Sequence, residues 1–333
     1  MLKSQIPNPK SQRKVKLSVT DRMLLDEIQR RFPLCARPYA KLGERLNLSE
    51  AAVLRRLRMY KANNLIRRIG PMFDARANRL TSVLIALSVP PSRVRHAVEC
   101  INSCEGVTHN YLRRHPLNIW FTLSGRDRAA QESILRKIKK KVSPLRYLEL
   151  PSKKVFKLAV IFDLGLPAGR RVRAERGGYS HRARMRCGRA PVGRSLMGKL
   201  APDLPLVSRP FPRGALKAIR VLTASGRIRR FGAILDGRRL GFRFNALVAW
   251  RADPGRIKEA GRRLASFPPV SHCYARVRSR SWPYDLYTMV HVRDRMRGRE
   301  LVADMARTAG IADYAVLETV RELKRSSVAP PMW

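Results

Sequence analysis

The chain has 333 residues, of which 44% are hydrophobic, so it can form two domains with buried cores. Its 70 Lys and Arg against 24 Asp and Glu give a formal net charge of +46. No apolar run approaches the roughly 20 residues that a membrane helix needs, and the basic stretch 1–16 lacks the apolar core of a secretory signal. We therefore expect a cytoplasmic protein with no membrane contact.

The charge indicates a polyanionic partner, because clustered Lys and Arg attract phosphates and carboxylates. Nucleic acid is the first candidate, and a small molecule with many carboxylates fits as well. Genomic bias toward Arg is the alternative explanation, since Arg is dense even between the two halves of the chain.

The five cysteines contain no Cys-x-x-Cys pair. Cys100 and Cys104 stand four residues apart near an expected helix end. Two thiols alone rarely make a zinc site, so we expect them in the core of a protein from a reducing compartment.

Residues 17–70 predict a winged-helix or helix-turn-helix domain. Leu24, Leu25 and Ile28 fall at helical spacing behind an N-cap at Ser18 or Thr20. The elements expected next are a short helix, a turn with an N-cap, and a helix with a basic outer face, over residues 39–46, 47–50 and 53–60. Such a tight turn before a basic third helix is typical of helix-turn-helix proteins.

Residues 71–165 change to the two-residue period of strands. The expected order is β-α-β-β-α-β, a ferredoxin-like unit. The predicted elements are strand 83–89, helix 91–103, strands 106–111 and 119–123, helix 126–140 and strand 145–150.

The second half of the chain repeats the first. The motifs beginning at positions 32, 66, 107 and 120 recur in the same order at 204, 228, 270 and 286, the last pairing Trp120 with Leu286. The offset is 172 at the first motif, 162 at the second and 163 at the third, so the second copy has lost ten residues of its helix-turn-helix. We expect a truncated helix-turn-helix over 200–236 and a second ferredoxin-like domain over 237–327.

The second ferredoxin-like domain is predicted to contain strand 244–250, helix 254–266, strands 270–276 and 285–291, helix 294–308 and strand 311–317. Between the copies, 170–199 holds ten Lys or Arg and the single acidic residue Glu175. Such a segment cannot bury enough apolar surface to offset its ordering entropy, so 166–199 is predicted to be a basic disordered linker. The fold class is α+β: a duplicated Lrp/AsnC-like unit whose two copies can pair within one chain.

The motifs resemble siroheme decarboxylases within the Lrp/AsnC family, over roughly residues 17–165 and 200–327. In the first copy these are Phe32-Pro33-Leu34 with Arg37-Pro38-Tyr39-Ala40, Ile66-Arg67-Arg68-Ile69-Gly70, His109-Asn110-Tyr111-Leu112-Arg113 and Asn118-x-Trp120-Phe121-Thr122. In the second copy they are Ser271-His272-Cys273-Tyr274-x-Arg276 and the run from Trp282 to His291. The two patterns are similar to the two subunit types of that enzyme.

The resemblance implies a carboxy-lyase that takes the C12 and C18 acetate carboxyls from siroheme, giving 12,18-didecarboxysiroheme for haem d1 or haem synthesis. No separate cofactor is implied, because siroheme brings its own iron. The partners implied are siroheme and the other copy, with further homo-oligomers open. Departures from the family pattern are Ala275 and Val277 beside Arg276, and Val292 after His291; they leave the activity of the second copy open.

The histidines carry the chemistry expected of the site. His109 and His272 are candidates for the axial iron ligand or the proton donor, since imidazole binds haem-type iron and titrates near neutrality. Tyr111 and Tyr274 lie two residues on, so each shares a strand face with its histidine and either donates a proton or packs. The alternative for each histidine is a structural hydrogen bond at a sheet edge.

Arginines are expected to anchor the carboxylates that stay, because a guanidinium binds a carboxylate through two hydrogen bonds. Arg113 and Arg276 continue the histidine faces, with Arg114 and His115 as weaker candidates. Trp120, Trp282 and Tyr284 either stack on the ring or pack in the core. The adjacent pairs at the repeated Ile-Arg-Arg motif either clamp carboxylates or are interdomain charges: Arg67, Arg68, Arg229 and Arg230.

Two rival functions remain. A DNA-binding regulator would use the helix-turn-helix and the positive charge, but the truncated second copy breaks the symmetric pair that reads a palindrome. A degenerate haem or siroheme carrier would bind the pigment and release no CO₂.

Overall fold

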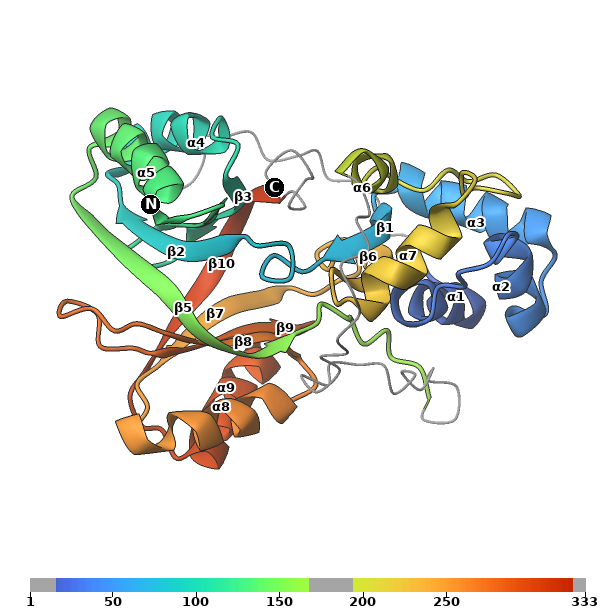
Figure 1. Ribbon diagram of the computed structural model, residues 1–333. Helices are drawn as coiled ribbons and strands as arrows, with labels where there is room; N and C mark the ends of the chain where they lie inside the picture. The colour runs from blue at the N-terminus through green and yellow to red at the C-terminus, as the bar shows by residue number, and fades with distance from the viewer. Residues whose placement is uncertain (1–15, 168–193, 326–333) are drawn as a thin grey trace.

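The computed structural model describes residues 16–167 and 194–325. Within these residues, eight strands close a barrel and two further strands pair in a separate ribbon. Helices cover two opposite sides of the barrel, and the ribbon connects the barrel to a helical lobe (Figure 1). None of the described helices is long and apolar enough to cross a membrane.

The helical lobe begins with the predicted helix-turn-helix, formed by α1 (Val19–Arg30), α2 (Pro38–Leu46) and α3 (Glu50–Ala62). Ser18 and Asp21 form a capping box at the start of α1, which satisfies two backbone N–H groups. Asn47 ends α2 in the left-handed conformation, and the Ser49 side chain caps α3. Local sequence therefore sets both ends of the turn.

The second copy adds α6 (Arg194–Leu200) and α7 (Ala215–Ala224) to the same lobe. The linker prediction was wrong at the end of 166–199, because α6 is helical and Met197 is buried in the lobe core. Leu166, at the start of that range, is buried as well. Residues 168–193, with most of the predicted linker and Cys187, lie outside the described residues.

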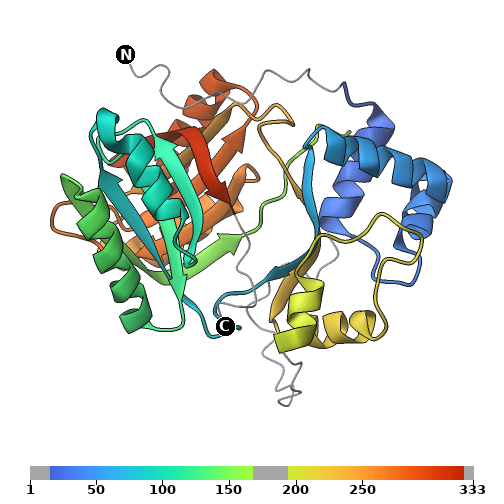
Figure 2. The same cartoon turned by 90° about the horizontal axis from the view of Figure 1, so that it is seen from above.

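A two-stranded ribbon joins the copies, and the sequence did not predict it. In this ribbon, β1 (Ile66–Phe73) pairs antiparallel with β6 (Ile228–Leu235), and Gly70 stands opposite Gly232. The ribbon lies between the barrel and the helices (Figure 2). The predicted boundary between residues 70 and 71 falls inside β1.

Each copy contributes the predicted βαββαβ order to the barrel, and a short 3₁₀ turn precedes its first helix. The first copy contains β2 (Thr81–Ser88), α4 (Val94–Asn102), β3 (Val107–Arg113), β4 (Ile119–Gly125), α5 (Arg128–Val142) and β5 (Arg146–Leu158). The second contains β7 (Phe244–Trp250), α8 (Ile257–Ser266), β8 (Val270–Arg276), β9 (Leu286–Val292), α9 (Arg295–Ala309) and β10 (Tyr314–Arg325).

The two sheets close on each other through their last strands. The barrel order is β10-β3-β4-β2-β5-β8-β9-β7. The first part of β5 pairs with β2, and its second part pairs with β8 of the other copy. Correspondingly, β10 pairs with β7 and then with β3. The expected strands 145–150 and 311–317 were too short because their extensions pair only across the copies.

The inner face of the barrel holds an apolar core drawn from both copies: Leu84, Ala86, Leu117, Trp120, Leu148, Leu150, Leu247, Ala249, Trp282, Tyr287 and Leu317. Strand register corrects the alignment of the fourth repeat. Tyr111 pairs with Trp120, and Tyr274 pairs with Tyr287, so Trp120 corresponds to Tyr287 and not to Leu286.

Candidate functional site at the junction of the two halves

The His-x-Tyr-x-Arg segment of β3 points away from the covering helices. Asn110, within it, donates a hydrogen bond from Nδ2 to Asn102 Oδ1 of α4 at 2.9 Å. Since neighbouring strand residues face opposite sides, His109, Tyr111 and Arg113 face the barrel interior. The rings of His109 and Tyr111 stack with centroids 6.4 Å apart, and the Arg113 guanidinium carbon lies 5.0 Å from the Tyr111 ring centre.

The β8 segment repeats this arrangement from the other half. Cys273 faces α8, where its thiol lies 3.4 Å from the Gly261 carbonyl oxygen. His272 stacks on Tyr274 with ring centroids 6.0 Å apart, and the Arg276 guanidinium carbon lies 5.2 Å from the Tyr274 ring centre. Two equivalent strands thus place imidazole, phenol and guanidinium in the same order inside one barrel.

The two arginines each bind the backbone of the opposite half. Arg113 donates to the Leu317 carbonyl at 3.1 Å and to Thr319 Oγ1 at 2.9 Å, both on β10. Arg276 donates to the Leu150 carbonyl of β5 at 2.7 Å. Within the described chain, the buried Nε of each has no hydrogen-bond partner. Burial lowers the pKa of Arg113 to about 10, so both guanidiniums remain cations at neutral pH and can take an anion.

The histidines from both halves experience the same cationic surroundings. Burial and then the charges of Arg325, Arg67 and Arg229 together lower the pKa of His109 to about 3. The pKa of His272 is also well below its usual value, through burial and then through His291, Arg229, His109 and Arg325. These imidazoles are therefore neutral at pH 7 and available as ligands or hydrogen-bond acceptors.

A third histidine joins the site from β9, and the sequence prediction gave it no role. Ser271 Oγ lies 2.8 Å from His272 Nδ1 and 2.8 Å from His291 Nε2, so it bridges the two imidazoles. Burial and then the charges of Arg325 and Arg113 together lower the pKa of His291 to about 3. The two-residue period of β9, which puts Tyr287, Met289 and His291 on one face, was the available signal.

The ribbon arginines divide by strand face. Arg67 pairs with Asp236 at 2.6 Å and with Glu322 of β10 at 2.5 Å, next to the histidines. Arg229 lies near Tyr274, and burial lowers its pKa. Both residues come from the ribbon face that meets the barrel.

The neighbouring arginines of the ribbon turn toward the helical lobe instead. Arg68 donates to the carbonyls of Ala201 and Pro71, and Arg230 donates to those of Gln29 and Val160. These two arginines therefore hold the lobe together, which matches the alternative of interdomain charges.

The remaining aromatic candidates pack in or beside the barrel core. Trp120 donates from its indole to the Leu117 carbonyl at 2.7 Å, and Trp282 donates to the Tyr287 hydroxyl at 2.9 Å. The two indoles contact each other with centroids 5.8 Å apart, and Trp282 also contacts Tyr284. This packing matches their core alternative.

Arg114 and His115 lie beyond the end of β3, about 17 Å along the chain from His109 at the usual rise per strand residue. Arg114 is exposed, and His115 packs edge-on against Trp282. His115 Nδ1 accepts the Leu117 backbone N–H at 3.0 Å. Both residues therefore sit at the opposite end of the strand from the histidine cluster.

The described cysteines do not form a metal site. Cys273 is buried, whereas Cys100 and Cys104 are half-buried, contrary to the expectation that both would be in the core. No group of three metal-binding side chains occurs among the residues that the structure describes.

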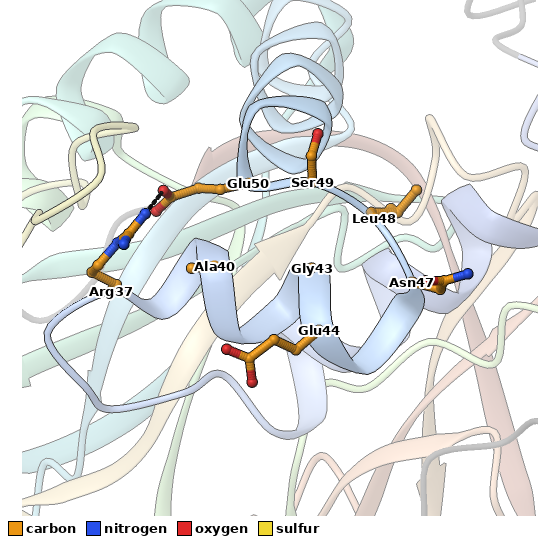
Figure 3. Close-up of a pocket in the computed structure, with 8 residues that line it drawn as sticks. All are labelled: Arg37, Ala40, Gly43, Glu44, Asn47, Leu48, Ser49 and Glu50. Atoms are coloured by element: carbon orange, nitrogen blue, oxygen red, sulfur yellow. Dashed lines mark hydrogen bonds and ion pairs between the residues drawn. The ribbon is translucent and has the colours of Figure 1, made fainter.

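A shallow pocket lies in the helical lobe at the turn between α2 and α3 (Figure 3). Arg37 and Glu50 form an ion pair of 2.6 Å on its rim, and Gly43 lies in its wall. A Cβ at Gly43 would stand 2.3 Å from the Leu48 carbonyl oxygen, so the glycine is needed for the tight turn. The pocket belongs to the turn and contains none of the histidines.

Comparisons with known proteins agree with this architecture. The AsnC-like ligand-binding domain matches residues 80–157 and 239–324, and the siroheme decarboxylase NirDL-like HTH domain matches residues 21–67. The siroheme decarboxylase of Hydrogenobacter thermophilus is 29% identical over 91% of this chain and 92% of its own length. The siroheme decarboxylase NirDL subunit of Paracoccus denitrificans is 32% identical over 85% of this chain and 88% of its own.

The fold comparison points the same way. The crystal structure of siroheme decarboxylase NirDL in co-complex with an iron-uroporphyrin III analogue is 25% identical, covers 93% of both chains and has a TM-score of 0.63. The family models match the helix-turn-helix of the first copy and the barrel-forming domain of both copies. The chain belongs to the siroheme decarboxylase family.

Proposed function

We propose that this chain decarboxylates siroheme, removing the C12 and C18 acetate carboxyls to give 12,18-didecarboxysiroheme without a separate cofactor. The observation that carries the proposal is the convergence of His109, His272 and their arginines from two halves into one barrel. Decarboxylation of an acetate breaks the bond between its methylene and carboxyl carbons. The electron pair stays on the methylene carbon, CO₂ leaves, and one proton converts the methylene to a methyl group.

The cationic surroundings support a polycarboxylate substrate. Arg229 and Arg325 lie close enough to depress the histidine pKa values, and Arg113 and Arg276 are buried with an unpartnered Nε. Of the nearby cations, Arg67 pairs with Asp236 and Glu322, and Arg325 pairs with Glu322 at 3.7 Å, so two carboxylates offset part of this charge. The excess positive charge favours binding of an anion that brings several carboxylates of its own.

The arginines are assigned to the carboxylates that remain on the ring. A guanidinium that gripped the scissile carboxylate would stabilise the ground state and slow the loss of CO₂. Arg113, Arg276, Arg229 and Arg67 are therefore proposed as substrate anchors. Tyr111 and Tyr274, whose pKa values are raised by burial, remain neutral and can donate a hydrogen bond beside the reacting acetates.

The histidines are assigned to the iron of the substrate and to the proton. A neutral imidazole is the form that binds iron, and burial among cations keeps His109 and His272 neutral. One of the two is proposed as an axial ligand and the other as the proton donor.

Specific DNA reading is disfavoured by a segment of the second copy that runs along the helix-turn-helix. Arg58 of α3 donates to the Leu206 carbonyl at 3.0 Å, and Lys61 pairs with Asp203 at 2.6 Å. Ser208 donates to Glu50 at the start of α3. A recognition helix needs its exposed face free to enter the major groove, and this segment flanks α3 from its first turn to its last.

The test is anaerobic incubation of the purified chain with siroheme, followed by mass spectrometry. Loss of the mass of two CO₂ is the expected result. If the siroheme stays unchanged while the folded protein shows the spectrum of bound pigment, the decarboxylase proposal is refuted and the chain is a pigment carrier. Salt-resistant, sequence-specific retention on duplex DNA would favour the regulator.

A further inference from the structure

The two halves of the site differ in the number of histidines on the interior face of the barrel. His291 lies on β9 opposite Asn245 of β7, and the equivalent strand position in the first copy is Ser124, opposite Ser82. The first copy therefore has one histidine, His109, where the second copy has two. Duplication alone would have given the same residue at both places.

Ser271 connects the two histidines of the second half. Its hydroxyl oxygen lies 2.8 Å from His272 Nδ1, 2.8 Å from His291 Nε2 and 3.2 Å from the Met289 carbonyl oxygen. A serine hydroxyl has one hydrogen to donate and two lone pairs to accept. At least one imidazole must therefore donate its N–H to Ser271, and the tautomers of the two histidines are coupled.

Three arrangements are compatible with these contacts. In one, Ser271 donates its hydrogen to the Met289 carbonyl oxygen and both imidazoles donate to Ser271, which leaves a lone pair on His272 Nε2. In the other two, the hydroxyl hydrogen turns to one of the histidines. When Ser271 donates to His272 Nδ1, His291 must donate from Nε2, and His272 carries its hydrogen on Nε2, the nitrogen not engaged by Ser271. When Ser271 donates to His291, His272 donates from Nδ1 and has a free lone pair on Nε2. The first of these two becomes the second when His272 gives up its Nε2 hydrogen, Ser271 passes its proton to His272, His291 passes its Nε2 proton to Ser271, and His291 takes up a new proton at Nδ1.

His291 has an unused end. Its Nδ1 is buried and has no hydrogen-bond partner within the described residues, although its Nε2 is bound to Ser271. Its ring lies edge-on to Phe162, with centroids 5.5 Å apart, which fixes the ring plane. A buried imidazole nitrogen without a partner is costly unless another molecule or a proton occupies it during the working cycle.

We propose that His291 is a positioning and relay residue that, through Ser271, sets the tautomer of His272 and resupplies its proton, so the second half is the proton-delivering side. This inference rests on the proposed decarboxylation. Each CO₂ lost requires one proton at the methylene carbon; His272 donates it from Nε2, and solvent replaces it through His291 and Ser271. His109, whose Nδ1 lies 3.0 Å from Thr108 Oγ1, is left for the iron.

The charged and titratable groups around His272 and His291 come from several elements. Arg229 of β6, His109 of β3 and Arg325 of β10 face His272, and Arg113 of β3 and Arg325 face His291. No carboxylate is among these neighbours. The phenol of Tyr274, which stacks on His272, keeps its proton because burial raises its pKa. Resupply of a proton donated by His272 is therefore assigned to the path through Ser271 and His291.

The experiment measures single-turnover decarboxylation by the full chain, anaerobically, with siroheme, together with the absorption spectrum and affinity of the bound siroheme. The variants are Ser271→Ala, His291→Leu and His291→Gln; Gln keeps a hydrogen bond toward Ser271 and cannot carry a proton. We expect all three to lose at least about tenfold in rate, the low side of the usual range for general acid catalysis, while the spectrum and affinity stay unchanged. His109→Ala is expected to change the iron spectrum instead.

Each possible outcome of this experiment either supports or overturns the relay. Wild-type rates in Ser271→Ala and His291→Gln would overturn the relay. A loss in His291→Leu alone, with full activity in His291→Gln, would overturn proton transfer and show a packing role. A changed iron spectrum in Ser271→Ala and His291→Gln, as strong as in His272→Ala, would place the iron on His272 and refute the assignment. If the wild-type chain itself releases no CO₂, the proposed function fails, and this inference fails with it.

Discussion

Replacing Gly232 by Ala tests how closely the ribbon approaches the helical lobe. A Cβ at Gly232 would stand 2.6 Å from the Ile28 carbonyl oxygen at the end of α1. Ordinary contact begins at 3.4 Å, so α1 and β6 must move apart by about 0.8 Å. Both belong to one packed core, in which overpacking costs about 1–3 kcal/mol.

The assay is thermal unfolding of Gly232→Ala beside Gly198→Ala. Since 1 kcal/mol shifts Tm by about 2–4 °C in domains of 150–250 residues, we expect Gly232→Ala to lower Tm by about 2–12 °C. Gly198 lies inside α6 with open space around its Cβ position, so the same change should stabilise that helix by up to about 1 kcal/mol. A Gly232→Ala chain as stable as wild type would refute the close approach.

Three further predictions concern charge. The pKa of His109 is about 3 in the folded chain against 6.5 in the unfolded chain, so the free energy of unfolding should fall as the pH drops from 6.5 toward 3. The variant His109→Gln should therefore show a weaker dependence of Tm on pH, whereas the control His96→Gln, at an exposed histidine, should not. Arg113→Lys and Arg276→Lys should each weaken siroheme binding about tenfold by titration, because Lys loses the guanidinium fork; exposed Arg136→Lys should leave it unchanged. The logarithm of the binding constant for duplex DNA should fall linearly with log salt and be equal for unrelated sequences; a sequence-dependent difference would contradict the reasoning from the segment that flanks α3.

Local sequence predicted the three helices of the first copy in the lobe, α1 to α3, and the strand order of each copy. Caps and apolar spacing act over a few residues, so Ser18, Asn47 and Ser49 mark helix ends before any tertiary contact is known. The same local signals identified the unit repeated in each copy.

Pairing between distant segments was not predictable in this way. The ribbon joins β1 to β6 across about half the chain, and the outer parts of β5 and β10 pair only with the other copy. The predicted strands therefore ended where their partners within one copy ended. Residues 194–199 were assigned to the disordered linker because the segment is basic. That assignment overlooked two apolar side chains at its end, Met197 and Leu200, which are buried in the lobe core.

The site prediction remains a prediction in its chemistry, although the structure now places its residues. The two-residue period was sufficient to put His109, Tyr111 and Arg113 on one face. The same period requires adjacent residues such as Arg67 and Arg68 to face opposite ways, but it cannot say which one meets the barrel. The bridge from Ser271 to His291 was missed because it joins two strands whose register only the folded sheet defines.

The mutual exchange of last strands has a consequence for how the chain reaches its working form. Contacts between residues far apart in sequence form slowly, and those of β10 with β3 join the final described strand to one near the middle of the first copy. During synthesis, β3 and β7 emerge with open edges that can pair with foreign chains. The interior that gathers the histidines thus comes into existence only after nearly the whole polypeptide has been made.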